Sequence, residues 1–220
     1  MKLALTILVC LARVSMWCCG CVSEPDKGKG IETFYELRYA SIVAQTEEYS
    51  CGAAALASLL NEYFGIQATQ QEILGVVEHQ MQARGEEPFL SAGLTAYDLK
   101  EASCRFGVEL AGYEVTALQL ADYFARGGLP LIAHVTRPGS HYVVVVGMRG
   151  EYVLLCDPGW GRTAVTVKAL VEGRGMSGVI LVALPNQEQA TLARGEQTCS
   201  LTWMAFHLLQ LLELRELVLP

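Results

Sequence analysis

A single cysteine, Cys51, stands directly in front of an apolar helical pattern in the stretch QTEEYSCGAAALASLLNEYFG, residues 45–65. The thiolate is the reactive form of cysteine, and a position at a helix N-terminus lowers the thiol pKa because the aligned peptide dipoles favour negative charge there. Gly52 and the three alanines after it keep the first turn slim, which would let a substrate backbone approach the sulfur. From this stretch alone two interpretations stay open: Cys51 is an activated nucleophile, or it is one more small core residue.

A nucleophilic thiol needs a base, and the chain has four histidines. His141 opens a run of valines directly after the turn RPGS, residues 137–140, and residues at strand ends beside loops are where sites are usually assembled. His79 lies on the charged side of a predicted helix and His207 lies in the tail, where solvated roles are expected. His134 falls inside the apolar run LPLIAHV, which favours a core or sheet-edge position. The sequence therefore predicts His141 as the base.

Asp157 is the predicted group that orients the imidazole. The strands predicted at 141–147 and 152–157 are joined by a short turn around Arg149, which indicates a hairpin. A hairpin that is symmetric about Arg149 places His141 directly opposite Asp157. A carboxylate in that position can hold the imidazole tautomer and stabilise the imidazolium. Asp157 also begins the good turn sequence Asp-Pro-Gly, and the two roles are compatible.

Gln45 lies six residues before the cysteine and is the candidate for an oxyanion hole. Its side-chain amide can donate an N–H to the carbonyl oxygen that Cys51 attacks, and the Cys51 backbone N–H at the helix start supplies a second donor. A glutamine at this spacing is a weak signal by itself, because Gln is common on loops.

The elements that must position these four residues follow from hydrophobic periodicity. Residues 34–45 mix aromatic and β-branched residues and predict an extended segment that leads to Gln45. Three helical patterns come next, and the chain then turns to strands, which predicts an α+β domain with helices packed on a mainly antiparallel sheet. The predicted helices are 51–64, 70–81, 96–106 and 117–126, and the predicted strands are 108–115, 129–135, 141–147, 152–157, 163–167 and 179–184.

Composition and the two ends of the chain set the wider organisation. Hydrophobic residues at 52% and charged residues at 18% predict one substantial core, and the net charge of −7 argues against a nucleic-acid partner. A basic start followed by an apolar run too short to cross a bilayer of about 30 Å predicts an export segment at 1–23. A linker at 24–33 and a domain at 34–185 follow. The extension 186–220 contains a leucine-rich amphipathic helix from 201, which packs on the domain or a partner, or lies on a membrane surface.

The cysteines predict neither a metal nor a cofactor. Four of the eight cysteines lie in the export segment, where Gly20-Cys21 is a candidate lipoprotein processing site at Cys21. The other four are widely spaced and form no CxxC pair, so zinc and thioredoxin-like sites are not indicated. Cys104 and Cys156 are interpreted as core residues, and a disulfide among Cys104, Cys156 and Cys199 stays open.

Taken together, the stretches QTEEYSCGAAAL, HYVVVVG and DPGWG resemble the bacterial peptidase C39 family, over about residues 40–185. These are papain-fold domains that cleave leader peptides after a Gly-Gly pair in bacteriocin-type exporters. The resemblance implies a papain-like cysteine peptidase without a cofactor. It also implies the site residues: Cys51 as nucleophile, His141 as general base and acid, Asp157 as orienting residue and Gln45 as oxyanion donor.

Two departures from that family pattern bear on substrate and location. Family members commonly carry an acidic residue just before the cysteine, where Ser50 stands here, and this affects substrate contacts but removes no catalytic group. The exporters attach the domain to six membrane helices and an ATPase, for which this chain is too short. The signal-like start resembles instead the standalone exported members, some of which accompany secretion systems for fibre-forming subunits.

The resemblance to those members implies a periplasmic or cell-envelope peptidase that acts on an exported peptide or protein. Secretion-system components and a membrane contact through the N-terminus are the other expected partners. Two alternatives remain open: a non-catalytic module that captures export substrates, and a peptidyl transferase that uses the same residues. Binding modules of this type usually lack the cysteine or the histidine, whereas this chain retains both. Transfer and hydrolysis share one thioester intermediate, so the sequence does not separate them.

Overall fold

The computed structural model describes residues 33–86 and 93–218. The predicted export segment 1–23, with Cys21, and nearly all of the predicted linker 24–33 lie outside the described residues. The chain divides into two compact units, residues 1–34 and 35–220, and the architecture below is that of the second unit. In the part of the chain that is described, no helix combines the length and the apolar character needed to cross a bilayer.

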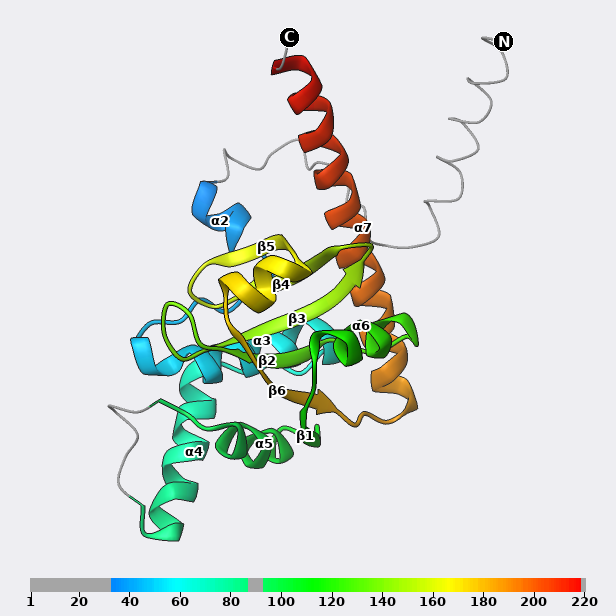
Figure 1. Ribbon diagram of the computed structural model, residues 1–220. Helices are drawn as coiled ribbons and strands as arrows, with labels where there is room; N and C mark the ends of the chain where they lie inside the picture. Colours follow the sequence, from blue (N-terminus) through cyan, green and yellow to red (C-terminus); the bar gives the residue numbers. More distant parts are fainter. Residues whose placement is uncertain (1–32, 87–92, 219–220) are drawn as a thin grey trace. The chain divides into compact units, whose positions relative to one another are not determined.

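Six antiparallel strands form one sheet (Figure 1). They are β1 (Leu110–Glu114), β2 (Leu131–Val135), β3 (His141–Arg149), β4 (Tyr152–Asp157), β5 (Gly161–Thr166) and β6 (Met176–Ala183). Their order in the sheet is β1-β6-β2-β3-β4-β5, so β6 returns from the end of the domain to lie between β1 and β2. The strands β3 and β4, which carry two of the predicted site residues, are neighbours in the sheet.

The helices lie on both faces of this sheet. They are α2 (Phe34–Arg38), the 3₁₀ turn η2 (Glu48–Ser50), α3 (Cys51–Phe64), α4 (Gln70–Arg84), α5 (Ala96–Arg105), α6 (Ala117–Ala125), the π-helical turn η3 (Ala169–Gly173) and α7 (Gln187–Val218). Local chemistry sets several of these bounds. Threonines at 69, 95 and 116 each begin a helix with a reciprocal capping box, and Gly65 ends α3 in the left-handed conformation, with φ of 65°.

The helix α3 is the centre of the fold. Asn61 and Glu62 are its only residues that are not buried, because β3, α4, α5 and α7 surround it. Side chains alternate along β3, so Val144 and Val146 pack in the core with α3, while Val143 and Val145 pack with α6 and η3 on the opposite face. The N-terminus of α3 is therefore fixed against one end of β3.

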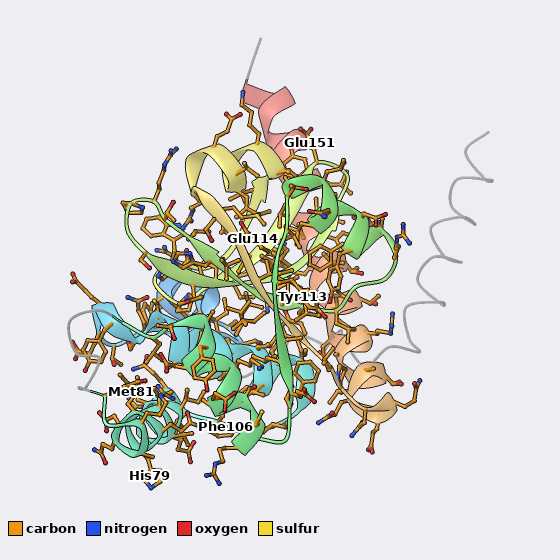
Figure 2. The ribbon with its side chains drawn as sticks, turned by 60° about the horizontal axis from the view of Figure 1, so that its bottom comes forward. His79, Met81, Phe106, Tyr113, Glu114 and Glu151 are labelled. Carbon is orange, nitrogen blue, oxygen red and sulfur yellow. The ribbon has the colours of Figure 1, made fainter. Side chains whose placement is uncertain are left out.

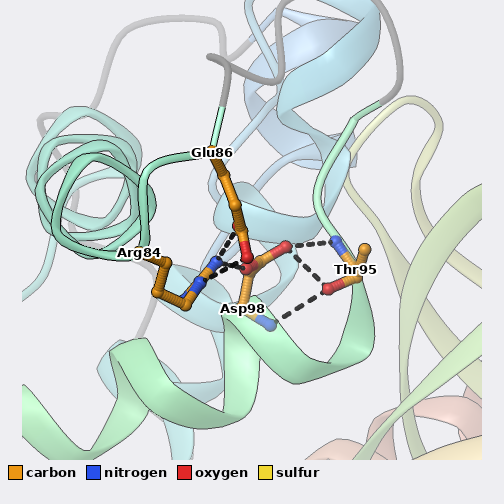
Figure 3. Close-up of polar contacts among 4 residues, drawn as sticks. All are labelled: Arg84, Glu86, Thr95 and Asp98. Atoms are coloured by element: carbon orange, nitrogen blue, oxygen red, sulfur yellow. Dashed lines mark hydrogen bonds and ion pairs between the residues drawn. The ribbon is translucent and has the colours of Figure 1, made fainter.

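A buried carboxylate joins the end of α4 to the start of α5 (Figure 3). Asp98 accepts hydrogen bonds from the Thr95 backbone N–H at 2.9 Å and from Arg84 Nη2 at 2.7 Å. Arg84 also pairs with Glu86 through the same nitrogen. These bonds hold α5 in the position where Leu99 packs against the first turn of α3.

Two predicted segments differ in the structure. The segment 34–45 was predicted to be extended, and this is wrong for its first part, because residues 34–38 form α2. The helix α7 begins at Gln187, although the polar stretch 186–200 has no clear helical pattern. Ala193, Ser200 and Met204 of α7 are buried against the core, so tertiary contacts stabilise a helix that the local pattern does not indicate. The expected packing of the leucine-rich part on the domain is observed at Leu201, Trp203 and Met204.

Candidate active site

Cys51 is the first residue of α3 and follows the 3₁₀ turn, in which the buried Ser50 hydroxyl donates to the Glu47 carbonyl at 2.7 Å. The thiol is buried, at 6% exposure, and the His141 side chain and the Tyr142 and Gly52 backbone act on its pKa. Burial by itself raises the pKa of the Cys51 thiol. Hydrogen bonds from the His141 side chain and from the backbone of Tyr142 and Gly52, together with the charge of His141, outweigh burial, so the pKa of Cys51 lies below its ordinary value.

Gly52 has a different role from the one predicted. A Cβ at this position would lie 3.2 Å from Leu99 Cδ1 and 3.2 Å from Tyr142 Cδ2. The glycine therefore admits core side chains from α5 and β3 and not a substrate backbone. The alanines at 53, 54 and 55 are also fully buried. The small residues of this turn let two elements close on the helix start, and this packing fixes Cys51 beside β3.

The register of the β3–β4 hairpin differs from the prediction. The turn is Gly150-Glu151, with Gly150 at φ of 61°, and Arg149 pairs with Tyr152. Symmetry about Arg149 is thus wrong, and so is direct pairing of His141 with Asp157. A regular ladder from this turn would put those two side chains on opposite faces of the sheet, because side chains alternate along a strand.

A β-bulge in β3 brings the His141 and Asp157 side chains to the same face of the sheet. The register shifts between Val145 and Gly147, and Val144 then pairs with Cys156. Continued by one residue, this register sets Val143 beside Asp157, so His141 becomes the diagonal neighbour of Asp157 on the same face. Val146 packs in the α3 core, and a Cβ on Gly147 would lie 3.0 Å from Leu201 of α7, so both residues face the same layer.

The imidazole and the carboxylate are in direct contact. His141 Nε2 lies 2.7 Å from Asp157 Oδ1, which also accepts the Gly159 backbone N–H at 2.9 Å. Burial lowers the pKa of His141, but its hydrogen bonds to Asp157 and Cys51 and their charges raise this pKa to about 9. Burial raises the pKa of Asp157, but the bond from His141 and the charges of His141 and Arg174 hold it below its ordinary value.

The shifts of Cys51 and His141 act in the same direction. Nε2 of His141 is used by Asp157, so Nδ1 is the ring nitrogen left to meet Cys51. The lowered thiol pKa and the raised imidazole pKa favour a thiolate beside an imidazolium.

Gln45 lies at the rim of the same site. Its backbone N–H donates to the Pro158 carbonyl at 3.0 Å, which ties the segment before α3 to the loop after β4. Its side-chain Nε2 is 3.4 Å from the Glu47 carbonyl, and its buried Oε1 has no hydrogen-bond partner within the described part of the chain. A half-turn of the amide exchanges these two atoms, so Gln45 can present an N–H without moving its backbone.

A pocket of about 480 Å³ opens beside His141. Trp160, which is 58% exposed, forms part of its wall, with the Arg38 guanidinium 3.9 Å above the indole ring. The pocket is lined by Gln45, Glu48, Arg137, Pro138, Gly139, Ser140, His141, Asp157, Gly159, Trp160 and Arg174.

The other histidines and cysteines lie outside this contact set. His79 points outward from α4 (Figure 2), and His207 is exposed on α7. His134 Nε2 is 2.8 Å from the Ser140 hydroxyl, and burial together with the charge of His141 lowers the pKa of His134. Cys156 is buried in the core as predicted, at 2% exposure.

The prediction of a core position for Cys104 is wrong, because Cys104 is exposed on α5. Both Cys104 and Cys156 are free thiols, so no disulfide joins either of them to Cys199. Among residues 33–86 and 93–218, no group of three or more His, Cys, Asp and Glu side chains is arranged to hold a metal ion.

Sequence reasoning missed Arg174. Its Nη1 lies 2.7 Å from Asp157 Oδ2, on the side of the carboxylate away from His141. The sequence offers only the local string Gly-Arg-Gly at 173–175, and nothing in it links this arginine to an aspartate 17 residues earlier. The contact depends on η3 crossing back over the sheet.

A cysteine at the start of a central helix, facing a histidine and an aspartate on an antiparallel sheet, is the arrangement of the papain-like cysteine peptidases. Residues 39–188 match the sequence profile of the peptidase C39 family. The chain belongs to the peptidase C39 family. The predicted family and the predicted α+β papain-like fold are confirmed, and the cysteine-peptidase class is confirmed at the level of the family.

Individual relatives agree with this assignment. The probable functional amyloid protease FapD of Pseudomonas aeruginosa is 30% identical over 160 residues, which are 71% of this chain. The chain spans 66% of that relative's length. A double-glycine-motif protease from an AMS/PCAT transporter, solved in complex with a leader peptide, superposes with a TM-score of 0.53 at 25% identity, over 66% of this chain and 91% of that one. The peptidase domain of Streptococcus ComA, a bifunctional ABC transporter, gives a TM-score of 0.54 at 23% identity, over 66% and 98%.

Proposed function

We propose that the chain hydrolyses a peptide bond in an exported peptide or protein, with Cys51 as nucleophile, His141 as general acid and base, and Asp157 as the residue that orients the imidazole. One observation carries this proposal. The His141 ring joins the two other residues: its Nε2 lies 2.7 Å from the buried Asp157 carboxylate, and its hydrogen bond and charge lower the pKa of the Cys51 thiol. The family assignment supports the same chemistry independently.

The reaction follows from the charge state of the pair. The Cys51 thiolate adds to the substrate carbonyl, and the imidazolium of His141 gives its Nδ1 proton to the leaving amine as the C–N bond breaks. The resulting thioester is attacked by a water molecule, whose proton goes to the now neutral His141. Collapse of that second intermediate releases the carboxylic acid and restores the thiolate and the imidazolium.

The developing oxyanion needs hydrogen-bond donors, and Gln45 with the Cys51 backbone N–H are the proposed pair. The present bond from Gln45 Nε2 to the Glu47 carbonyl is long, at 3.4 Å. Little is lost when this amide turns toward the substrate carbonyl, because a hydrogen bond of that length is weak.

The pocket beside His141 is proposed to bind the residues that follow the cut. His141 must reach the leaving amine, so the chain after the scissile bond lies on the imidazole side of the sulfur. The pocket lining contains His141, Asp157 and Trp160. An exposed indole and small backbone surfaces from Gly139 and Gly159 suit an extended peptide segment there.

The substrate class and the location are part of the proposal. FapD is named as a functional amyloid protease, and the AMS/PCAT relative was solved with a leader peptide. With the signal-like start at 1–23, these names support a periplasmic or envelope-associated enzyme that processes an exported fibre-forming subunit or leader-type peptide. Secretion-system components are the proposed partners.

The proposal is tested with the full chain and a panel of synthetic peptides that contain a Gly-Gly pair or other candidate cleavage sequences, read by mass spectrometry. Wild-type protein should cleave at least one peptide, and Cys51→Ala should cleave none. Cys104→Ala is the matched control, since it removes a free exposed thiol. Equal cleavage by Cys51→Ala would end the proposal. A product joined to an added amine such as glycinamide would show transfer in place of hydrolysis.

A further inference from the structure

We propose that Arg174 is a positioning residue of this site: its guanidinium fixes the orientation in which the Asp157 carboxylate holds the His141 ring. The inference rests on the proposed roles of His141 and Asp157. Arg174 Nη1 donates to Asp157 Oδ2 at 2.7 Å, and the Asp157 side chain is only 2% exposed.

The two carboxylate oxygens have separate partners. Oδ1 accepts from His141 Nε2 at 2.7 Å and from the Gly159 backbone N–H at 2.9 Å, and Oδ2 accepts from Arg174. The plane of the carboxylate is therefore fixed from both ends. Without Arg174, Oδ2 would be a buried charged oxygen lacking this partner, and rotation about the Cβ–Cγ bond would compete with the bond to His141.

The backbone of Arg174 is held as firmly as its side chain. Its N–H donates to the Ala169 carbonyl at 2.9 Å, which closes the π-helical turn η3. Its own carbonyl accepts the N–H groups of Thr136 at 3.2 Å and Arg137 at 3.0 Å, from the end of β2. Gly175 permits this approach, because a Cβ there would lie 2.5 Å from Thr136 Oγ1.

This anchoring distinguishes Arg174 from an ordinary surface arginine. Exposed ion pairs contribute little, since two long side chains must be ordered in solvent. Here the acceptor is buried and the donor backbone is already fixed, so less ordering remains. Positive and negative groups alternate along one line, from Arg174 through Asp157 and His141 to Cys51. Single π-helical turns are frequently found at functional sites.

Other charged and titratable groups lie around Asp157 and His141. Those that act on Asp157 or His141, or that share the pocket with them, are Tyr39, Glu48, Cys51, His134, Arg137 and Arg174. Arg137 provides a matched control. It lines the same pocket and carries the same charge, but its Nη1 donates to the Glu172 carbonyl.

The test is an NMR titration of the full chain, in which long-range ¹H–¹⁵N spectra report the protonation and tautomer of each imidazole. The chain has only four histidines, and a His141→Gln variant assigns the resonance of His141. We expect His141 in the wild type to titrate at about 9. In Arg174→Met the midpoint should fall by about one pH unit or more, a tenfold loss of proton affinity, with a mixed tautomer above it.

The direction of the change separates positioning from simple electrostatics. Loss of a nearby positive charge alone would raise the His141 midpoint, whereas loss of the oriented carboxylate lowers it. Arg137→Met removes the control charge and should leave the midpoint unchanged or slightly raised. Arg174→Lys keeps the charge without the planar guanidinium. Its His141 midpoint should therefore lie between those of Arg174→Met and the wild type.

An Arg174→Met protein with an unchanged or raised His141 midpoint and an unchanged tautomer would overturn the inference, even if its melting temperature fell. If Arg174→Met does not fold, Arg174→Gln is used, because its amide keeps one neutral N–H donor. A smaller lowering of the His141 midpoint is then expected in Arg174→Gln. An unchanged midpoint in that variant would also overturn the inference. The titration uses no substrate. It therefore stands or falls separately from the peptide-cleavage assay.

Discussion

Replacing Asp157 by Asn tests the link between the buried carboxylate and the activity of the site. The substitution keeps the shape of the side chain and removes its charge. His141 and Arg174 each lose a charged acceptor at 2.7 Å. The pKa of His141 is about 9 in the folded protein because Asp157 and Cys51 both stabilise the imidazolium. In Asp157→Asn only Cys51 still stabilises the imidazolium. We therefore expect the pKa of His141 in this variant to lie between about 6.5, the unperturbed value, and about 8.

The size of the effect follows from the fraction of His141 that carries a proton. With a pKa of about 9, about nine tenths of the imidazole is protonated at pH 8. With a pKa of about 7, about one tenth is protonated, so the general acid is present about tenfold less often at pH 8. The loss should vanish toward pH 6, because both proteins are then largely protonated, and only the effect of poorer orientation remains.

The assay is kcat/KM against pH, with the rate of Cys51 alkylation by iodoacetamide as a second readout. The alkaline limb of kcat/KM should move from about 9 in the wild type to below about 8 in Asp157→Asn. An alkaline limb that stays at about 9 in Asp157→Asn would refute the assignment of Asp157 as the partner of the imidazolium.

Stability gives a separate check with its own control. Removing one partner from a buried ion pair costs about 3 kcal/mol or more, and the partial exposure of His141 and Arg174, 19% and 26%, reduces this to about 2 kcal/mol. The depressed pKa of Asp157 means that its contribution is present above its ordinary pKa of 3.8 and is lost as the pH falls through the folded value. The stability gap between the two proteins should therefore close in acid. Asp98→Asn, which breaks the pair with Arg84 seen in Figure 3, should cost a similar amount and leave the alkaline limb unchanged.

Three further substitutions test other parts of the site. Cys51→Ala should abolish turnover while its melting temperature stays close to that of the wild type, and in the wild type iodoacetamide should label Cys51 faster than the exposed Cys104 near neutral pH, because the pKa of Cys51 is lowered. Gln45→Ala should lower kcat by about 10² to 10³ with little change in the alkylation rate of Cys51, since it removes only an oxyanion donor; an unchanged kcat would exclude that role. Gly52→Ala should cost about 1–3 kcal/mol in a urea titration, because its Cβ would lie 3.2 Å from Leu99 and from Tyr142. A Gly52→Ala protein as stable as the wild type would contradict the packing argument.

Much of the fold could be predicted because its determinants are local. The capping boxes at Thr69 and Thr116 join residues only three apart, and the structure contains both. The apolar pattern of 51–64 marks a helix whether or not its partners are known, and α3 spans those residues. The candidate nucleophile and base could also be predicted, because Cys51 precedes a helical pattern and His141 begins a strand pattern.

The errors arose where distant contacts decide the local structure. The residues of 34–38 adopt a helix, although the segment 34–45 as a whole mixes aromatic and β-branched residues. The helix α7 extends through a polar stretch because Ala193 and Ser200 are buried. The outward position of Cys104 on α5 depends on which face of that helix meets α3. Periodicity in a ten-residue helix does not settle that choice.

The sequence by itself determined which side chains were available for thiol chemistry and which segments would become helices and strands. Tertiary structure decided whether those side chains could meet. The bulge at Val146 places His141 and Asp157 on one face of the sheet, and it forms because both Val146 and Gly147 pack toward the layer of α3 and α7. Arg174 reaches Asp157 only because η3 returns across the sheet. Both outcomes depend on packing between residues far apart in the chain, and such contacts leave no periodic signal in the sequence.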